Sequence, residues 1–139
     1  MHYIKIQEDP INFSDLYQKL IDPKFGGIDV FIGTVRQWTN DIETSEIEYS
    51  AYIDMAMKEL NKLAIEIENK GANVVIVHRL GLLSLTEASV FVGVAASHRD
   101  EAFKWCRYLI DELKKNVPIW KKEFNDHGID WGGIQTSAN

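Results

Sequence analysis

The stretch from Ser89 to Pro118 constrains the fold more strongly than any other part of this chain. Its first eight residues, Ser89 to Ala96, form an apolar run rich in β-branched side chains, which predicts a buried strand. Ser97 and Asp100 then have the spacing of a capping box, a signature of a helix start. Pro118 must end that helix, because proline lacks the N–H that the next backbone hydrogen bond requires. Apolar residues recur at helical spacing within it, at Phe103, Cys106, Ile110, Leu113 and Val117.

The remaining segments indicate further strands and two more helices. Strands are predicted over residues 3–7, 28–35, 47–51, 74–77 and 119–124, with a last short element over 131–134. One helix is expected from a cap at Asn12 or Ser14 to about Leu20, and another from an N-cap at Asp54 to a terminating Gly71. Residues 37–44 are polar and aperiodic, which predicts a mobile loop. The whole pattern predicts one α+β domain over residues 1–139, with mixed strands and about three helices.

The composition excludes several classes of function. The chain has 15 Lys and Arg against 21 Asp and Glu, a formal net charge of -6, which disfavours a nucleic-acid partner because such binding needs a basic face. Its single cysteine, Cys106, permits no intramolecular disulfide and lies on an apolar helix stripe, so we expect a core residue rather than a nucleophile. We expect no metal, since the four histidines lack ligand spacing. No apolar run approaches the ~20 residues of a membrane span, and a cytoplasmic protein is expected.

Cationic side chains gather where predicted elements begin and end. Arg36 follows a strand, and either marks the point where the strand meets water or holds a ligand. His98 and Arg99 stand at the start of a helix, where free N–H groups and the dipole favour an anion, and Arg99 adds a fork that can hold phosphate through two N–H groups. His78 and Arg79 also follow a strand, but a solvated turn explains them. The pattern favours a small anionic ligand.

Two lysines lie on either side of the helix stop at Pro118. A helix C-terminus favours cations, so Lys114 also has a purely structural explanation. Lys121 and Lys122 lie in an extended segment and point to opposite faces, so at most one of them faces a given pocket. A lysine that is partly desolvated beside an aromatic residue such as Trp120 can have a lowered pKa and act as a general acid or base.

Several segments, taken together and in order, resemble the large, catalytic subunit of molybdopterin synthase. They are Phe31–Arg36, His78–Gly81, Phe91–Val94 with Ser97–Arg99, and Val117–Glu123. The resemblance covers the chain from about residue 25 to Trp131, and it implies an α/β hammerhead fold with an additional antiparallel β subdomain. Asp130 departs from the pattern, because some relatives have a basic residue there, and it leaves open any cationic contact at that edge of the pocket.

The resemblance implies a sulfurtransferase that converts cyclic pyranopterin monophosphate into molybdopterin by installing a dithiolene. The sulfur would come from a thiocarboxylated, ubiquitin-like small subunit, whose C-terminal tail enters the pocket of the large subunit. Large subunits would form a homodimer with one small subunit at each end, a heterotetramer, and no cofactor is implied. By match of motif, Lys114 and Lys121 carry over as the catalytic lysines. The substrate-binding residues carry over as Thr34, Val35, Arg36, His98, Arg99, Lys122 and Glu123.

Two questions remain open at the level of sequence. A non-catalytic module that binds a phosphorylated metabolite or an extended peptide tail would use the same cations. In one continuous helix, moreover, the backbones of Arg99 and Lys114 lie roughly 22 Å apart, although both are assigned to the substrate. We therefore expect a site shared across a two-fold dimer, in which His98 and Arg99 of one chain approach Arg36, Lys114 and Lys121 of the other. A helix broken midway, or an extended ligand within one chain, is the alternative.

Overall fold

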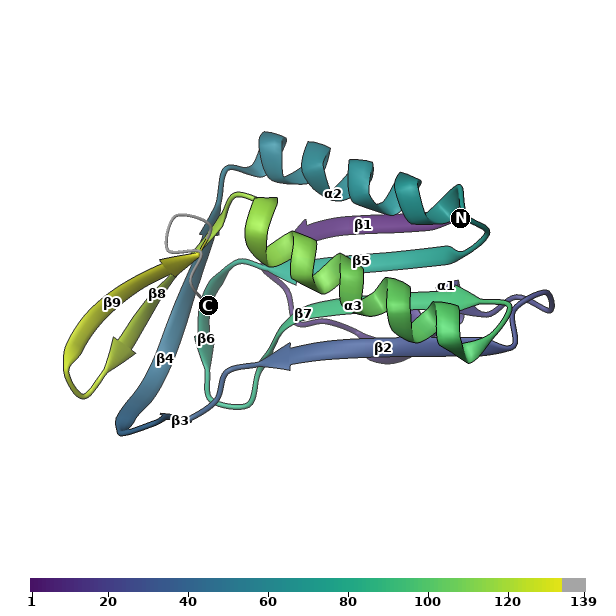
Figure 1. Cartoon of the computed structure of the whole chain (residues 1–139). Helices are drawn as coiled ribbons and strands as arrows, with labels where there is room; N and C mark the ends of the chain where they lie inside the picture. Colours follow the sequence, from purple (N-terminus) through teal and green to yellow (C-terminus); the bar gives the residue numbers. More distant parts are fainter. Residues whose placement is uncertain (134–139) are drawn as a thin grey trace.

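The computed structural model describes residues 1–133 of the chain, and its elements form two sheets and three helices within that range (Figure 1). In chain order they are β1 (His2–Gln7), α1 (Phe13–Leu20), β2 (Gly27–Thr34), β3 (Trp38–Thr39), β4 (Ile42–Ala51), α2 (Ile53–Glu68), β5 (Asn73–Arg79), β6 (Gly81–Ser84), β7 (Ala88–Ala96), α3 (Arg99–Asn116), β8 (Ile119–Asn125) and β9 (Gly128–Gly133). Residues 1–133 contain no helix with the length and apolar character that a membrane crossing needs.

The main sheet has four strands in the order β1-β5-β7-β2, and helices cover both of its faces (Figure 1). β1 runs parallel to β5, whereas β7 is antiparallel to both β5 and β2. On one face, α2 and α3 pack against alternate residues of the central strands, such as Val74 and Val92. On the other face, α1 packs against Val75 and Phe91. Because both faces of β5 and β7 are covered, these strands are buried along almost their whole length.

The second sheet is antiparallel and stands at one end of the first (Figure 1). Its strands follow the order β3-β4-β8-β9, and β6 also pairs with β4. A small core lies beneath it, formed by Val35, Ile47 and Leu83. The chain enters this sheet from α3 through Val117 and Pro118, so the end of that helix and the start of β8 are adjacent. The arrangement is the expected α+β fold with its additional antiparallel subdomain, and that prediction is confirmed.

The predicted mobile loop over residues 37–44 was wrong. β3 and the beginning of β4 form a short hairpin there, and the N–H of Thr44 donates to the carbonyl of Gln37 at 2.7 Å. The hairpin turns at Asn40, which has a positive φ of 55°, a conformation that asparagine tolerates better than most residues. The sequence did not reveal this hairpin for two reasons: its residues are mostly polar, and β3 is too short to show an alternating pattern. The strand β6 was missed because its four residues, Gly81–Ser84, are also too few to show an alternating pattern.

The helix starts also differ from the predictions, except for α1, where the Asn12 side chain accepts a hydrogen bond from the N–H of Asp15. Tyr52 occupies the N-cap position of α2 and His98 that of α3, and neither side chain forms a capping hydrogen bond. Tertiary packing sets the start of α3, because Gly27 packs directly against the backbone of Arg99.

Two other predictions differ in detail. In α3, Phe103 is 56% exposed, whereas its spacing predicted a buried side chain. The last predicted element extended to residue 134, which lies outside the described residues.

Candidate functional site

Three cations from separate parts of the sequence come together where the two sheets meet. Arg36 follows β2, and the residue before it, Val35, is held by two hydrogen bonds with the turn between β6 and β7. The N–H of Val35 donates to the carbonyl of Glu87 at 3.1 Å, and the carbonyl of Val35 accepts from the N–H of Thr86 at 2.8 Å. Lys114 lies in the last turn of α3, and Lys121 is the third residue of β8. The strand end, the helix end and the strand start thus supply one cation each.

The environment of Lys121 shows that these charges interact. Its side chain is half-buried, and burial lowers the pKa of its ammonium group. Repulsion from Lys114 and from Arg36 lowers the pKa further, whereas the carboxylate of Glu123 acts in the opposite direction. The aliphatic stem of Lys121 lies over Gly132 of β9, where the Cβ of any larger residue would lie 3.0 Å from Cε of the lysine. Gly132 therefore leaves the space through which this lysine extends.

The charges of the three cations are not neutralised by ion pairs within the described chain. Other cations have such partners: Lys115 lies 3.8 Å from Glu112, Arg107 lies 3.8 Å from Asp111, and Arg79 lies 3.4 Å from Glu87. In residues 1–133, no carboxylate lies within 4.0 Å of Arg36, Lys114 or Lys121. We call these three residues the cation cluster. Uncompensated positive charge beside a partly buried lysine is suited to bind an anion and to move protons.

Sequence reasoning missed one residue at this site, Tyr49 of β4. It lies opposite Lys121 in the pairing of β4 with β8, and therefore on the same face. Burial raises the pKa of its hydroxyl, a hydrogen bond with Ser89 lowers it, and the nearby carboxylate of Glu123 raises it. Its ring packs edge-on against His78 with centroids 5.1 Å apart. A tyrosine in a predicted strand gives no sign of this role, because only the strand register brings it to the lysine.

The predicted residue Glu123 belongs to the same face of β8 as Lys121. Its carboxylate accepts a hydrogen bond from the side-chain amide of Asn125 at 2.9 Å, which restrains its position. Glu123 acts electrostatically on both Lys121 and Tyr49. It thus provides the negative charge of the site without forming a direct ion pair with the lysine.

The structure does not bring all predicted substrate residues into the cation cluster. Lys122 lies on the opposite face of β8, where its ammonium group stands over the rings of Phe124 and Trp131, at 5.2 and 5.4 Å from their centroids. The side chain of Val35 is buried in the core of the second sheet, so only its backbone is near the site. Thr34 is exposed at the end of β2, two residues before Arg36.

His98 and Arg99 lie at the far end of α3 from Lys114. The helix is continuous from Arg99 to Asn116, which excludes the alternative of a helix broken midway. At a rise of 1.5 Å per residue, the two ends are roughly 22 Å apart. Both residues are exposed, and Gly27 at the start of β2 abuts them. Within one chain, the cations of the predicted site therefore form two separate groups.

Two further expectations concerned residues outside the site. Cys106 is a core residue, as predicted, and its thiol donates to the carbonyl of Val92 at 3.5 Å. Burial, reinforced by the nearby Asp29, raises the pKa of the thiol to about 12.

The solvated turn predicted at His78 and Arg79 was wrong, because both side chains are buried in β5. Arg79 donates to the Glu8 carbonyl at 3.0 and 3.2 Å and so holds the chain that follows β1 against the end of β5.

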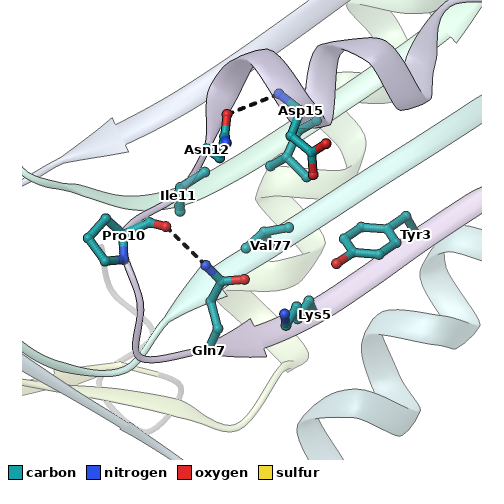
Figure 2. Close-up of a pocket in the computed structure, with 9 residues that line it drawn as sticks. Tyr3, Lys5, Gln7, Pro10, Ile11, Asn12, Asp15 and Val77 are labelled. Atoms are coloured by element: carbon teal, nitrogen blue, oxygen red, sulfur yellow. Dashed lines mark hydrogen bonds between the residues drawn. The ribbon is translucent and has the colours of Figure 1, made fainter.

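A shallow cavity of about 170 Å³ lies away from the cluster, between β1 and α1 (Figure 2). Two of its polar side chains, Gln7 and Asn12, are hydrogen-bonded to nearby backbone. The amide of Gln7 donates to the carbonyls of Asp9 at 2.9 Å and Pro10 at 3.2 Å, and Asn12 caps α1. The cavity therefore has a structural explanation in the turn that joins the two elements.

Comparison with known proteins decides the family. The profile of the MoaE protein family matches residues 6–116, most of the chain. The chain belongs to the MoaE family. A curated MoaE relative, the molybdopterin synthase catalytic subunit of Bacillus subtilis, is 42% identical over 137 residues, which cover 97% of this chain and 87% of the relative. These findings confirm the resemblance on which the sequence-based expectations rest.

Solved structures show the same relationship. The crystal structure of molybdopterin synthase from Staphylococcus aureus superimposes with a TM-score of 0.86 at 38% identity, and covers 92% of this MoaE chain and 95% of that one. A complex of subunits 1 and 2 of the molybdopterin-converting factor from Helicobacter pylori superimposes with a TM-score of 0.76 at 22% identity, over 93% and 89% of the two chains. The latter likeness shows that the fold is shared.

Proposed function

We propose that this chain is the catalytic subunit of a molybdopterin synthase, which converts cyclic pyranopterin monophosphate into molybdopterin. The observation that carries the proposal is the cation cluster, in which Arg36, Lys114 and Lys121 gather without compensating ion pairs in the described chain. The substrate carries a phosphate, and the proposed sulfur donor ends in a thiocarboxylate. Both are anions that such a cluster would hold through charge-assisted hydrogen bonds.

Each residue of the site has a defined part in this proposal. Lys121 is the candidate general acid or base, because its lowered pKa brings proton exchange closer to neutral pH. Lys114 supplies charge beside it and contacts the reacting anion. Arg36 holds the phosphate with its planar fork. Glu123 and Tyr49 flank Lys121 and set the charge and hydrogen bonding around it.

The sulfur has to come from outside this chain. The only cysteine, Cys106, is buried with a raised thiol pKa and cannot reach the cluster. A thiocarboxylated ubiquitin-like small subunit is the proposed donor, and the two-subunit complex of the Helicobacter pylori relative supports such a partnership. We assign the assembly to the cytoplasm, with a homodimer of this chain at the centre of a heterotetramer.

The separation of the two cationic groups supports a site shared between two copies. His98 and Arg99 of one chain would approach the cation cluster of its partner and complete the substrate site. Mixing Arg99→Ala with Lys121→Ala tests this arrangement, because each mixed dimer then regains one intact site. Recovery of activity after subunit exchange is expected. No recovery, despite exchange shown by mass spectrometry of differently tagged subunits, would contradict the shared site.

Reconstitution tests the function itself. The protein is mixed with a thiocarboxylated small subunit and cyclic pyranopterin monophosphate, and molybdopterin is measured. Lys114→Ala should lower the rate by about 10²-fold or more, as expected for a lost catalytic group. Lys115→Ala is the matched control, since that neighbour pairs with Glu112 and should retain activity. A folded wild-type protein that binds the pterin phosphate but forms no dithiolene would favour the alternative, a non-catalytic binding module.

A further inference from the structure

The side chain of Tyr49 packs against the cores of both sheets. Among residues 1–133 it is the one partly buried apolar side chain that contacts both the core of the main sheet and the small core of the second sheet. Its ring also lies edge-on against His78 of β5, with the ring centroids 5.1 Å apart. Tyr49 therefore stands at the junction of the two sheets, where the cation cluster lies, and packing from both sides restrains its ring.

The hydroxyl group of Tyr49 begins a chain of two hydrogen bonds. It bonds to the side chain of Ser89 in β7, whose own hydroxyl donates to the carbonyl of Gly33 in β2 at 3.2 Å. Ser89 has only one hydroxyl proton and a carbonyl can only accept, so the oxygen of Ser89 must accept from Tyr49. We call the series from Tyr49 through Ser89 to Gly33 the hydroxyl chain. Because Ser89 is only 5% exposed, water has little access to break it.

A β-bulge places Ser89 at the centre of this chain. In the pairing of β2 with β7, Gly33 lies opposite Val90, whereas the next residue, Thr34, lies opposite Ala88. Ser89 is therefore the extra residue of β7, and bulges of this kind redirect a side chain. Gly33 permits the close approach of the two strands here, because a Cβ on it would lie 2.8 Å from Cγ1 of Val90. The backbone thus directs the hydroxyl of Ser89 at the end of β2.

The two ends of the hydroxyl chain lie beside two members of the cation cluster. Tyr49 is opposite Lys121 in the pairing of β4 with β8, so their Cβ atoms lie about 5 Å apart on one face. At the other end, Gly33 precedes Arg36 by three residues. Lys121 and Arg36 carry like charges that repel each other, so the surrounding structure has to fix their separation. The hydroxyl chain connects the strand beside one cation to the strand that leads to the other.

We propose that Tyr49, acting through Ser89, is a positioning residue that holds Lys121 at a fixed separation from Arg36. This inference rests on the proposed function, in which one substrate contacts both cations. The arginine holds the phosphate while proton transfer occurs at the lysine, so the distance between the two side chains decides whether the reacting atoms are aligned. The hydroxyl of Tyr49 is engaged by Ser89, which is why its role is positioning and not catalytic.

Removal of single links tests the positioning role. Tyr49→Phe and Ser89→Ala each take away one hydroxyl of the chain. If a displacement of ~1 Å costs about 10²-fold, a shift of about half an ångström should lower molybdopterin turnover about tenfold and leave KM almost unchanged. The double variant should be no slower than the slower single variant, since either change breaks the same chain. Losses that add in the double variant, or wild-type turnover in both single variants, would overturn the inference.

Two matched controls lose a hydrogen-bonded hydroxyl elsewhere in the chain. The hydroxyl of Tyr108 donates to Glu66 at 2.9 Å, and that of Ser45 donates to the carbonyl of Phe124 at 3.0 Å. Tyr108→Phe and Ser45→Ala should keep wild-type turnover. An equal loss in these controls would overturn the inference, because the effect would then follow from the loss of any hydroxyl.

The pKa of Lys121 separates positioning from a purely structural role, and NMR of isotope-labelled lysine measures it without substrate. The charged neighbours of this ammonium group are Lys114 of α3, Arg36 after β2 and Glu123 of its own strand. If the hydroxyl chain holds Arg36 close against the repulsion, breaking the chain lets the two charges move apart. The repulsion then weakens, so the pKa of Lys121 should rise in both link variants and stay unchanged in the controls.

Ser89→Ala gives the clearest result, because it leaves Tyr49 unchanged beside the lysine. A lysine pKa above that of the wild type supports the inference, whereas a loss of stability in urea with an unmoved pKa overturns it. These measurements need no turnover, so the two proposals can fail separately. A protein in which the pKa responds but which makes no molybdopterin refutes only the proposed function, and an active enzyme indifferent to both substitutions refutes only this inference.

Discussion

The space above Gly132 offers a direct test of Lys121. Substitution of Gly132 by alanine would place a methyl group 3.0 Å from Cε and 3.3 Å from Cγ of that lysine. Carbon atoms prefer separations of about 3.5–4.0 Å, so the stem of the lysine must retreat by a few tenths of an ångström, up to about 0.5 Å. The change touches the lysine that we propose to be catalytic while leaving its chemical nature intact.

The expected effect on catalysis is larger than the effect on stability. A displacement of ~1 Å can lower a rate by about 10²-fold, so a shift of half that size should cost roughly tenfold in turnover. Stability should change little, because the flexible stem can yield, and alanine recovers about 0.5–1 kcal/mol over glycine inside a strand. We expect the free energy of unfolding to stay within about 1 kcal/mol of the wild type.

A double-mutant cycle distinguishes this mechanism from general disturbance. Molybdopterin formation is measured for Gly132→Ala, Lys121→Ala and the double variant, with urea unfolding of each. If the methyl group acts through the lysine, Gly132→Ala lowers the rate on its own but has no further effect once Lys121 is absent. Full activity of Gly132→Ala, or an equal loss in both backgrounds, would refute the reasoning.

Four further predictions follow from the other contacts. Lys114→Gln removes a repulsion that lowers the pKa of Lys121, so the limb of the pH–rate profile governed by that lysine should move to higher pH; an unmoved limb would separate the two lysines. Arg36→Ala should weaken substrate binding by about 1.5–3 kcal/mol in a calorimetric titration, and Arg36→Lys should restore it only in part; unchanged affinity would remove this arginine from the site. Cys106→Ala should keep synthase activity and lose about 1 kcal/mol of stability, whereas a folded but inactive variant would mean that this chain carries sulfur. Burial lowers the pKa of His78 from 6.5 to about 4, so the unfolded chain binds the proton first as the pH falls, and urea unfolding should show about 2 kcal/mol less stability at pH 5 than at pH 7; His78→Gln should lose that part of the pH dependence.

Local patterns in the sequence were sufficient for much of the secondary structure. The apolar run over residues 89–96 and the helix that stops before Pro118 are both present, because burial and the missing proline N–H act within a few residues of chain. The cap at Asn12 is likewise a local hydrogen bond. Helix starts at Tyr52 and His98 were not foreseen, since packing between distant segments, such as Gly27 on Arg99, determines them.

The sequence alone determined that Lys121 and Lys122 face opposite sides, because side chains alternate along any strand. Only the tertiary structure decided which of them faces the site. The pairing of β8 with β4 puts Lys121 beside Tyr49, and the end of α3 brings Lys114 to it. Strand register and helix packing depend on contacts between residues far apart in the chain, and local periodicity carries no information about them. For the same reason, only the fold showed that the cations form two separate groups at opposite ends of α3.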